Sequence, residues 1–417
     1  MPPTQYLNFD LLIDRAATGY QARVIESPAG QAARPFQLPA GLEAQPAALA
    51  LVGGAIRAYQ WAGAAGQEAP TPRDPRAFGE ELFQAVFAGD VGDALRRSLD
   101  LAAQQGAGLR IRLRLTYAPE LAALPWEYLY VTPWRRFAVL SDQTPLVRYL
   151  EIGQAAAPLT TQLPLRVLVM LSDPMDVTPR LNVEAEWARL EQALAELQRQ
   201  NAILLTRIPA TLTALQRTLR RDAYHLFHFI GHGWYDEATG DAGLLLEDEQ
   251  RKGERVDATR LGILLHDHRA LRLAFLNACE GARVDRGEPF TGVAQHLVQQ
   301  GLPAVIAMQF PITDRAAITL AQEFYQALAD SYPVDAALTE ARKAVFLGGS
   351  IMEWGTPALF TRADDNQLFA LPGAPGAVNE APARASTVVN TGGGAYVGGN
   401  VNTGGGDFVG RDKRVRG

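Results

Sequence analysis

A histidine and the chain's single cysteine stand at the ends of two apolar stretches. His232 follows the stretch 223–230 within Gly-His-Gly, and Cys279 follows the stretch 271–276 within Asn-Ala-Cys-Glu-Gly. Short continuous apolar runs are typical of strands that are buried on both faces of a parallel sheet. Reactive groups in such sheets collect beyond the carboxyl ends of the strands, so neighbouring strands would bring these two side chains within reach of each other.

The chemistry that this pair favours is nucleophilic catalysis. A thiol near its free pKa is only partly ionised and needs a base, and a histidine titrates near neutrality and later protonates the leaving amine. The backbone N–H of Gly233 would approach a substrate carbonyl closely and, with the N–H of Cys279, would form an oxyanion hole. We therefore predict Cys279 as nucleophile and His232 as acid/base. A small buried thiol is the alternative for a lone cysteine.

Other polar residues lie near these positions. His228 shares a strand face with His232 and is predicted to support it, with a packed core histidine as the alternative. Asp314 follows a further apolar stretch and is predicted to line a pocket for a basic substrate side chain, although aspartate there is also typical of a helix N-cap. Asp236 and Glu280 are further candidates for this pocket.

Metal and nucleotide sites are not expected. His225 faces the opposite side of its strand from His228 and His232, which argues against a site of three histidines. One cysteine cannot supply a site of two or more thiolates. The sequence has no GxxxxGK[ST] loop, and no GxGxxG follows the strand 165–171. We predict no metal and no cofactor.

The elements that must position this chemistry lie in residues 163–370. Predicted strands cover 165–171, 202–208, 223–230, 243–247, 271–276 and 304–308, and predicted helices cover 183–200, 212–220, 259–265, 292–300, 315–329 and 334–346. Strands that alternate with helices predict a mostly parallel sheet with helices on both faces, which is a three-layer α/β/α sandwich.

Residues 1–162 are predicted to form a separate α+β domain. Strands are expected at 6–14, 20–26 and 109–115, and helices at 40–64 and 78–105, with a break near Gly89. The strand 109–115 reads LRIRLRL, so its arginines alternate with apolar residues. We expect these arginines to form a solvated face rather than a binding patch.

The end of the chain has a different composition. Residues 371–386 are rich in Pro, Ala and Gly and are predicted to be a linker. Residues 387–417 form a Gly-rich tail in which 389–400 (VNTGGGAYVGGN) and 401–412 (VNTGGGDFVGRD) repeat each other. A disordered linker is one interpretation. The matched positions of Tyr396 and Phe408 favour the other, a β-type docking or oligomerisation tag that orders on assembly.

The strings HFIGHG and LNACEG, in this order at two strand ends, resemble the His-Gly and Ala-Cys motifs of the caspase–separase clan, and within it CHAT-domain proteins. GLLLED and, in the N-terminal half, LAALPWEYLY extend the resemblance over about residues 1–370. It implies a caspase-like fold and a thiol protease, with Cys279 as nucleophile, His232 as general acid/base, and Gly233 and Cys279 as oxyanion-hole donors. The repeat tail resembles those of effectors in bacterial defence and conflict systems.

Composition bounds the remaining function classes. The net charge of −6 argues against general nucleic-acid binding, and we find no apolar run near 18 residues and no secretion signal. A single cysteine suits a reducing cytoplasm. We therefore predict a cytoplasmic cysteine endopeptidase that acts on one or a few protein partners and that is engaged by a regulatory or sensor protein, or oligomerises, through residues 387–417. The alternative is a catalytically silent caspase-like scaffold.

Overall fold

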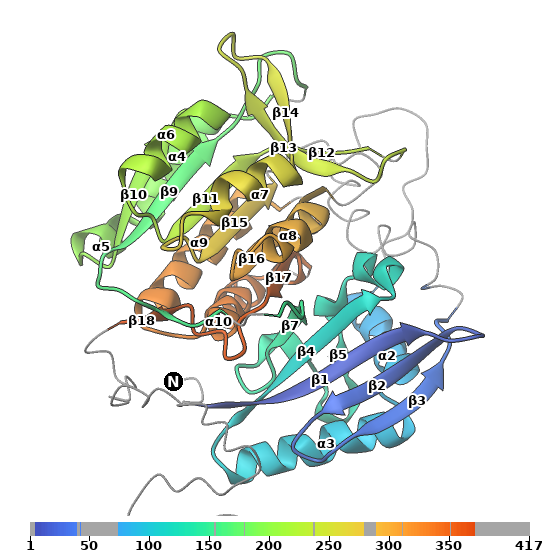
Figure 1. Cartoon of the computed structure of the whole chain (residues 1–417). Helices are drawn as coiled ribbons and strands as arrows, with labels where there is room; N and C mark the ends of the chain where they lie inside the picture. Colours follow the sequence, from blue (N-terminus) through green and yellow to red (C-terminus); the bar gives the residue numbers. More distant parts are fainter. Residues whose placement is uncertain are drawn as a thin grey trace, which may run out of the picture. The chain divides into compact units, whose positions relative to one another are not determined.

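The computed structural model of the chain describes residues 5–39, 42, 74–153, 156–178, 180–236, 238–278, 289–310, 312–350 and 352–371. Within these residues, eleven strands form one sheet (Figure 1). Their order across the sheet is β10 (Ile203–Ile208), β9 (Leu165–Leu171), β11 (Leu226–Gly231), β15 (Leu273–Ala278), β16 (Ala304–Met308), β17 (Pro357–Thr361), β7 (Leu146–Tyr149), β4 (Gly108–Tyr117), β1 (Tyr6–Arg15), β2 (Tyr20–Glu26) and β3 (Ala32–Phe36).

Most neighbouring strands in this sheet are parallel. The five strands from β10 to β16 all run in the same direction. β17 is antiparallel to β16, and β17, β7, β4 and β1 are then parallel to one another. β2 and β3 continue from β1 as antiparallel hairpins at the far edge. The predicted α/β class with a mostly parallel sheet is confirmed.

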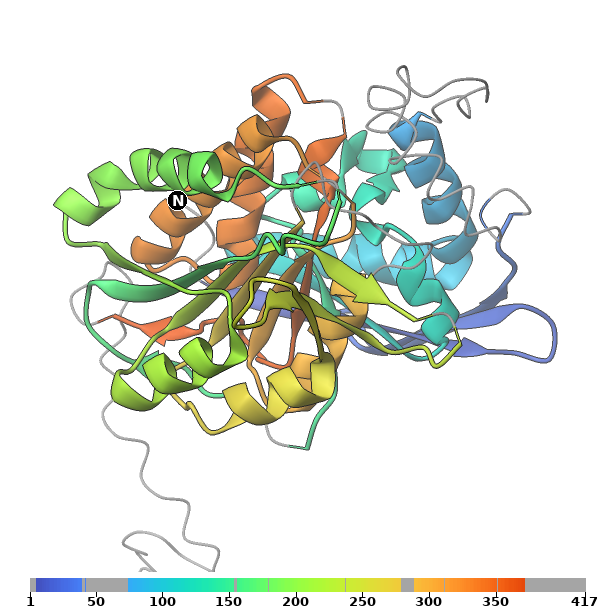
Figure 2. The ribbon, with the colours of Figure 1, turned by 90° about the horizontal axis from the view of Figure 1, so that it is seen from above.

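Helices cover both faces of the sheet around β9, β11 and β15. Figure 2 shows α4 (Val183–Ala193), α9 (Asp314–Ala329) and α10 (Val334–Leu347) on one face, where α9 contacts both α4 and α10. The other face carries α6 (Leu212–Arg221), α7 (Ala258–His266) and α8 (Pro289–Gln299), and α7 packs on α8. The predicted three layers are therefore present in this part of the chain.

The apolar runs form the central strands because both of their faces are covered. In β9, Val167, Leu168, Val169 and Met170 are fully buried, and every residue of β11 is buried. Each such side chain contributes roughly 1.5–3 kcal/mol through its removal from water. A strand made mostly of apolar residues is typical of such a doubly covered position, as the sequence pattern indicated.

Smaller elements surround the sheet. A three-stranded sheet consists of β12 (Gly233–Tyr235), β13 (Ala242–Glu247) and β14 (Gly253–Asp257), and it leaves the main sheet directly after β11. Two further pairs are β8 (Leu159–Thr160) with β18 (Phe369–Ala370), and β5 (Tyr130–Val131) with β6 (Arg136–Phe137). α5 (Ala195–Arg199) follows α4 after Leu194, so the helix predicted at 183–200 is divided in two.

In the N-terminal half, the strands predicted at 6–14, 20–26 and 109–115 are present as β1, β2 and β4, whereas β3, β5, β6 and β7 were not predicted. The predicted long helix is two helices, α2 (Pro75–Val86) and α3 (Gly89–Gln104). The break falls at Phe87 and Ala88, directly before Gly89, whose φ of +55° suits glycine. Asp74 caps α2 by accepting a hydrogen bond from the backbone N–H of Arg76. The helix predicted at 40–64 lies outside the described residues, apart from Leu42.

Both predicted domains contribute to the main sheet. β7 from the N-terminal half pairs in parallel with β17, and Phe360 lies opposite Arg148. The predicted boundary at residue 162 falls between β8 and β9 and stays a prediction, as do the linker 371–386 and the tail 387–417, which lie outside the described residues from 372 onward. No helix among the described residues is both long and apolar enough to span a bilayer.

The expectation of a solvated arginine face on β4 is wrong. Arg110, Arg112 and Arg114 are 1%, 5% and 8% exposed. Their side chains are buried because acidic partners reach them from other elements: Asp335 of α10 pairs with Arg110, and Asp10 of β1 pairs with both Arg112 and Arg114. β4 is thus covered on both faces, with charge pairs on one of them.

Candidate active site

The ends of β11 and β15 lie side by side. The two strands pair in parallel, with Ile230 opposite Asn277 and Gly231 opposite Ala278. His232 is the next residue after Gly231, and Cys279 is the next residue after Ala278. Cys279 itself lies outside the described residues. The condition for the predicted dyad, that the two strands are neighbours, is therefore met, and the dyad itself stays a prediction.

His232 occupies a confined position between the strand end and the β12–β14 sheet. It is 1% exposed, and its carbonyl oxygen accepts a hydrogen bond from the N–H of Leu245 in β13, at 2.9 Å. The preceding Gly231 has no room for a side chain, because a Cβ there would lie 2.7 Å from the Phe229 ring and 3.1 Å from the Ser172 carbonyl oxygen. Glycine therefore allows the ends of β9 and β11 to approach each other closely at the base of the site.

Asp173 lies at the same edge and was not singled out from the sequence. It is 3% exposed, and both of its carboxylate oxygens accept hydrogen bonds from Arg180, while one also accepts from the N–H of Leu181 at 2.9 Å. Burial acts to raise the pKa of Asp173, but the hydrogen bonds from Arg180 and Leu181 and the charges of Arg180 and His232 outweigh it and leave the pKa lowered. The rule that polar groups collect at the carboxyl ends of strands would have found this residue too.

His228 is packed in the core beneath this edge. Its Nδ1 lies 2.8 Å from the hydroxyl oxygen of Tyr325 in α9, and its ring lies 4.8 Å from that of Phe275. Burial lowers the pKa of His228 to about 3, so the ring is neutral at physiological pH. The supporting role of His228 stays a prediction.

Asp314 is the first residue of α9, close after the end of β16. The N-cap of that helix is Thr313, whose hydroxyl accepts from the N–H of Ala316, so the aspartate does not have the capping role. Asp314 instead forms a partly exposed ion pair with Arg189 of α4. Its carboxylate is thus already matched to a guanidinium, and its place in a substrate pocket stays a prediction.

The other predicted site residues are distributed over two segments. Gly233 begins β12 directly after His232 and pairs with Leu244. Asp236 lies three residues farther along, in the turn to β13, where its side chain accepts a hydrogen bond from the N–H of Ala238. Glu280, like Cys279, lies outside the described residues. Gly233 and Asp236 therefore lie at the start of β12 and directly after its end.

The described residues include no group of three His, Cys, Asp or Glu side chains arranged to hold a metal ion. His225 and His228 have different surroundings: His225 lies 3.1 Å from the Thr161 hydroxyl and accepts from the N–H of Arg166, whereas His228 contacts Tyr325. This separation agrees with their predicted placement on opposite faces.

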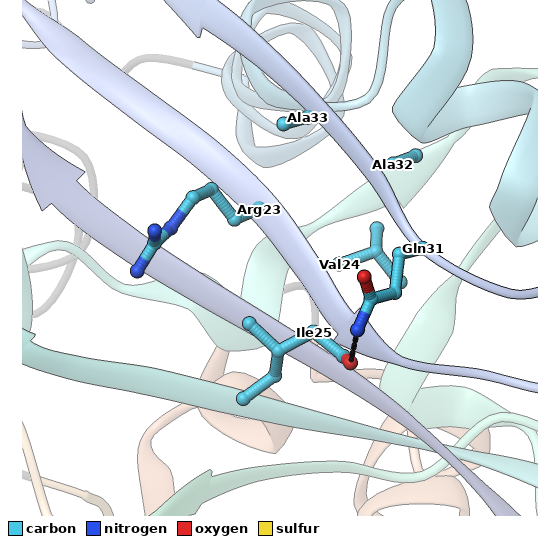
Figure 3. Close-up of a pocket in the computed structure, with 6 residues that line it drawn as sticks. All are labelled: Arg23, Val24, Ile25, Gln31, Ala32 and Ala33. Carbon is cyan, nitrogen blue, oxygen red and sulfur yellow. Dashed lines mark hydrogen bonds between the residues drawn. The ribbon is translucent and has the colours of Figure 1, made fainter.

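A hollow of about 450 Å³ lies elsewhere, on the β2–β3 hairpin (Figure 3). Gln31 donates to the carbonyl oxygen of Ile25 across it at 3.0 Å, and Arg23 at its rim is paired with Asp14. These edge strands lie at the opposite end of the strand order from β10, and the hollow brings no acid–base pair together.

Comparison with known proteins identifies one family. The CHAT domain profile matches residues 76–363. None of the curated protein sequences matches the chain.

Solved structures that resemble the fold include three cysteine proteases. The Arg-specific cysteine proteinase gingipain R aligns over 75% of this chain and 76% of its own, with 11% identity and a TM-score of 0.41. Separase of Saccharomyces cerevisiae, in its securin complex, aligns over 61% of this chain and 15% of its own, with 13% identity and a TM-score of 0.31. The Drosophila initiator caspase Dronc aligns over 54% and 99%, with 14% identity and a TM-score of 0.30. This chain spans only a small part of separase, and likenesses of this size carry no argument about chemistry.

The family assignment therefore rests on the sequence profile. The matched segment begins in α2 and ends after β17, so it includes strands from both halves of the main sheet and the ends of β11 and β15. Since it spans well over half of the 417 residues, this chain belongs to the CHAT-domain family.

Proposed function

We propose that this chain is a cysteine endopeptidase in which Cys279 is the nucleophile and His232 is its acid/base partner. One observation carries the proposal: Gly231 pairs with Ala278, so the two reactive residues each follow directly from paired positions on neighbouring parallel strands. The side-chain types at these two positions are those that acyl transfer needs. The membership in the CHAT family supports the same reading.

The reaction proceeds in two steps. The Cys279 thiolate attacks the scissile carbonyl carbon, and the backbone N–H groups of Gly233 and Cys279 bind the oxyanion that forms. The His232 imidazolium then gives its proton to the leaving amine, which departs as the C–N bond breaks. Next, neutral His232 takes a proton from water, and the resulting hydroxide attacks the thioester. The C–S bond breaks, which restores the Cys279 thiolate beside the His232 imidazolium, and the carboxylic acid product gives its proton to solvent as it leaves.

Asp314 is proposed to receive a basic side chain from the substrate, with Asp236 and Glu280 near it. Its present ion pair with Arg189 supports this proposal, because the carboxylate already binds a guanidinium that a substrate arginine would replace. In an Asp314→Asn variant we expect cleavage after basic residues to fall at least tenfold relative to other residues. An unchanged preference would remove Asp314 from the pocket.

The first experiment compares wild-type protein with Cys279→Ala in a native bacterial lysate, followed by sequencing of newly formed N-termini. New termini that appear with wild type alone would establish peptide-bond cleavage and would give the preferred residue. A lysate without new termini, even when the products of neighbouring genes are added, would favour the catalytically silent scaffold. Full cellular function of the Cys279→Ala protein would favour it as well.

We further propose that the protease is a regulated effector in a bacterial defence or conflict system, that it acts in the cytoplasm on one or a few proteins, and that residues 387–417 engage its regulator or assemble it. The support is the paired 12-residue repeat. Deletion of residues 387–417 should leave peptide hydrolysis intact and abolish regulated cleavage. Unchanged regulation in the truncated protein would exclude this role of the tail.

A further inference from the structure

Three neighbouring strand ends are in register at the candidate site. Parallel pairing places Leu171 of β9 opposite Ile230 of β11, and the N–H of Ser172 donates to the carbonyl oxygen of Ile230 at 2.9 Å. The Ser172 carbonyl lies beside Gly231, as the 3.1 Å distance to a Cβ built there shows. The residues that follow Ser172 and Gly231 are Asp173 and His232, so the two occupy equivalent positions on adjacent strands.

The carboxylate of Asp173 is held in place. Arg180 donates to it at 2.5–3.0 Å, the N–H of Leu181 donates at 2.9 Å, and the backbone N–H of Asp173 itself donates to Glu247 of β13 at 3.1 Å. Asp173 is buried, whereas the Arg180 side chain is about half exposed, at 47%. The anion therefore lies on the inner side of the ion pair, at the end of the strand that pairs with the strand preceding His232.

We propose that Asp173 is a positioning residue for the proposed peptidase reaction, which acts through His232 by stabilising its imidazolium form, and that Arg180 moderates this effect from the solvent side. The catalytic part of this inference rests on the proposed function. The coupling among the charges of Asp173, His232 and Arg180 does not, and it can be measured without any substrate.

The need for such a group follows from burial. His232 is 1% exposed, and transfer of an imidazolium ion from water into the protein interior disfavours the protonated form. The leaving amine requires that same protonated form as its proton donor. A fixed carboxylate on the adjacent strand offsets the burial. The half-exposed guanidinium prevents the histidine from becoming too weak an acid.

The charged groups in and around the Asp173–Arg180 ion pair come from two elements. Asp173 and Arg180 lie on the segment after β9, and Glu247 lies at the end of β13, where it also pairs with Arg251. The predicted nucleophile Cys279, followed by Glu280, succeeds β15. Because Glu247 is common to all the variants below, the changes in the pKa of His232 report on Asp173 and Arg180.

The test is nuclear magnetic resonance of the full-length protein labelled with ¹³C at histidine, in which a His232→Ala variant assigns the signal of His232 among the six histidines. Removal of the anion in Asp173→Asn should lower the pKa of His232 by about 1 unit. Removal of the cation in Arg180→Gln should raise it by about half a unit, since the side chain is half exposed. Asp176→Asn is the matched control, because Asp176 lies on the same segment but accepts a hydrogen bond from Gly253. It should leave the value unchanged.

Opposite signs in the two variants support the coupling. Shifts of the same sign, or no shift in either, would overturn it, because loss of the segment's structure alone would change both variants in the same way. Arg180→Gln alters a half-exposed side chain and keeps the test valid if Asp173→Asn does not fold.

A second measurement separates this inference from the proposed function. The chain has one cysteine, so the rate of alkylation by iodoacetamide as a function of pH reports on Cys279 alone. If His232→Ala leaves that profile unchanged, the Cys–His dyad fails, while the resonance shifts still decide the Asp173–His232 coupling. If the profile changes and the resonance shifts are absent, the dyad stands and the coupling fails.

Discussion

β4 and β11 are both interior strands of the same sheet, but they differ in the titratable side chains that they bury. Those of β4 are charged and paired, whereas that of β11 is neutral. β4 carries three arginines along its length, all buried and all paired with acidic residues. β11 carries one titratable residue within the strand, His228, whose pKa is lowered so far that it stays neutral. Its next titratable residue, His232, follows the strand end.

This contrast separates charges that hold the fold from charges available for chemistry. A buried arginine persists only when an acidic partner is supplied, since an unpaired buried charge is very costly. Asp10 serves Arg112 and Arg114 together, and the ring of Tyr149 lies 4.5 and 4.8 Å from their guanidinium carbons. Guanidinium groups that are buried and paired in this way hold the strands together and exchange no proton near neutral pH.

The largest effect that would sharpen this comparison is expected from Asp10→Ala. The substitution leaves Arg112 and Arg114 in the interior without this shared partner, so the free energy of unfolding should fall by about 3–5 kcal/mol. Urea denaturation monitored by tryptophan fluorescence measures it. A loss below about 1 kcal/mol would mean that water reaches these arginines and that β4 is not a closed interior strand.

A pH-dependent effect is expected from His228. Its pKa falls from 6.5 to about 3 on folding, so between those values the unfolded chain binds a proton that the folded protein does not. The free energy of unfolding should therefore be constant above pH 6.5 and should decrease as the pH falls below it, by on the order of a few kcal/mol near pH 4. Denaturation series at pH 8, 6 and 4.5 for wild type and His228→Gln test this. If the free energy of unfolding depends on pH equally in the two proteins, His228 takes up its proton in the folded protein as readily as in the unfolded chain.

A smaller effect is expected from Tyr325→Phe. The variant removes the hydroxyl that lies 2.8 Å from Nδ1 of His228 and should lower the free energy of unfolding by about 1 kcal/mol at pH 8. The ring and its packing stay, so catalysis of the intact protein should not change. A loss of activity with unchanged stability would instead assign His228 a direct role in supporting His232.

The smallest effect is expected at a surface ion pair of the N-terminal half. Arg15 bonds Glu120 at 2.7 Å, but the Arg15 side chain is 66% exposed. Solvent screens such pairs, so Arg15→Ala should leave the urea midpoint unchanged within error. A clear decrease in the urea midpoint would contradict the contrast between buried and exposed pairs, because exposed and buried arginines of this half would then contribute alike to stability.

Much of the fold was predictable from local pattern. Apolar runs and helical periodicity located β9, β10, β11, β13, β15 and β16 and the helices between them, because a doubly covered strand and an amphipathic helix each impose their own spacing on a sequence. The short strands β12 and β14 were not predicted. The same reasoning placed His232 and Cys279 at two strand ends. Asp173 lies just after the end of a third strand, β9, but no glycine-containing motif marked it in the sequence.

Local sequence was enough for the α/β class, for the alternation of strands and helices in residues 163–370 and for the Gly-His-Gly and Ala-Cys strings, since these depend on residues near one another in the chain. Which strands are neighbours and which charges are buried became known only from the packed structure. Arg110 meets Asp335 across 225 residues, and β7 meets β17 across more than 200, and no local pattern encodes such pairings. The arginines of β4 looked solvated for this reason: exposure depends on what packs against a strand, and acidic partners from distant segments supplied the cover.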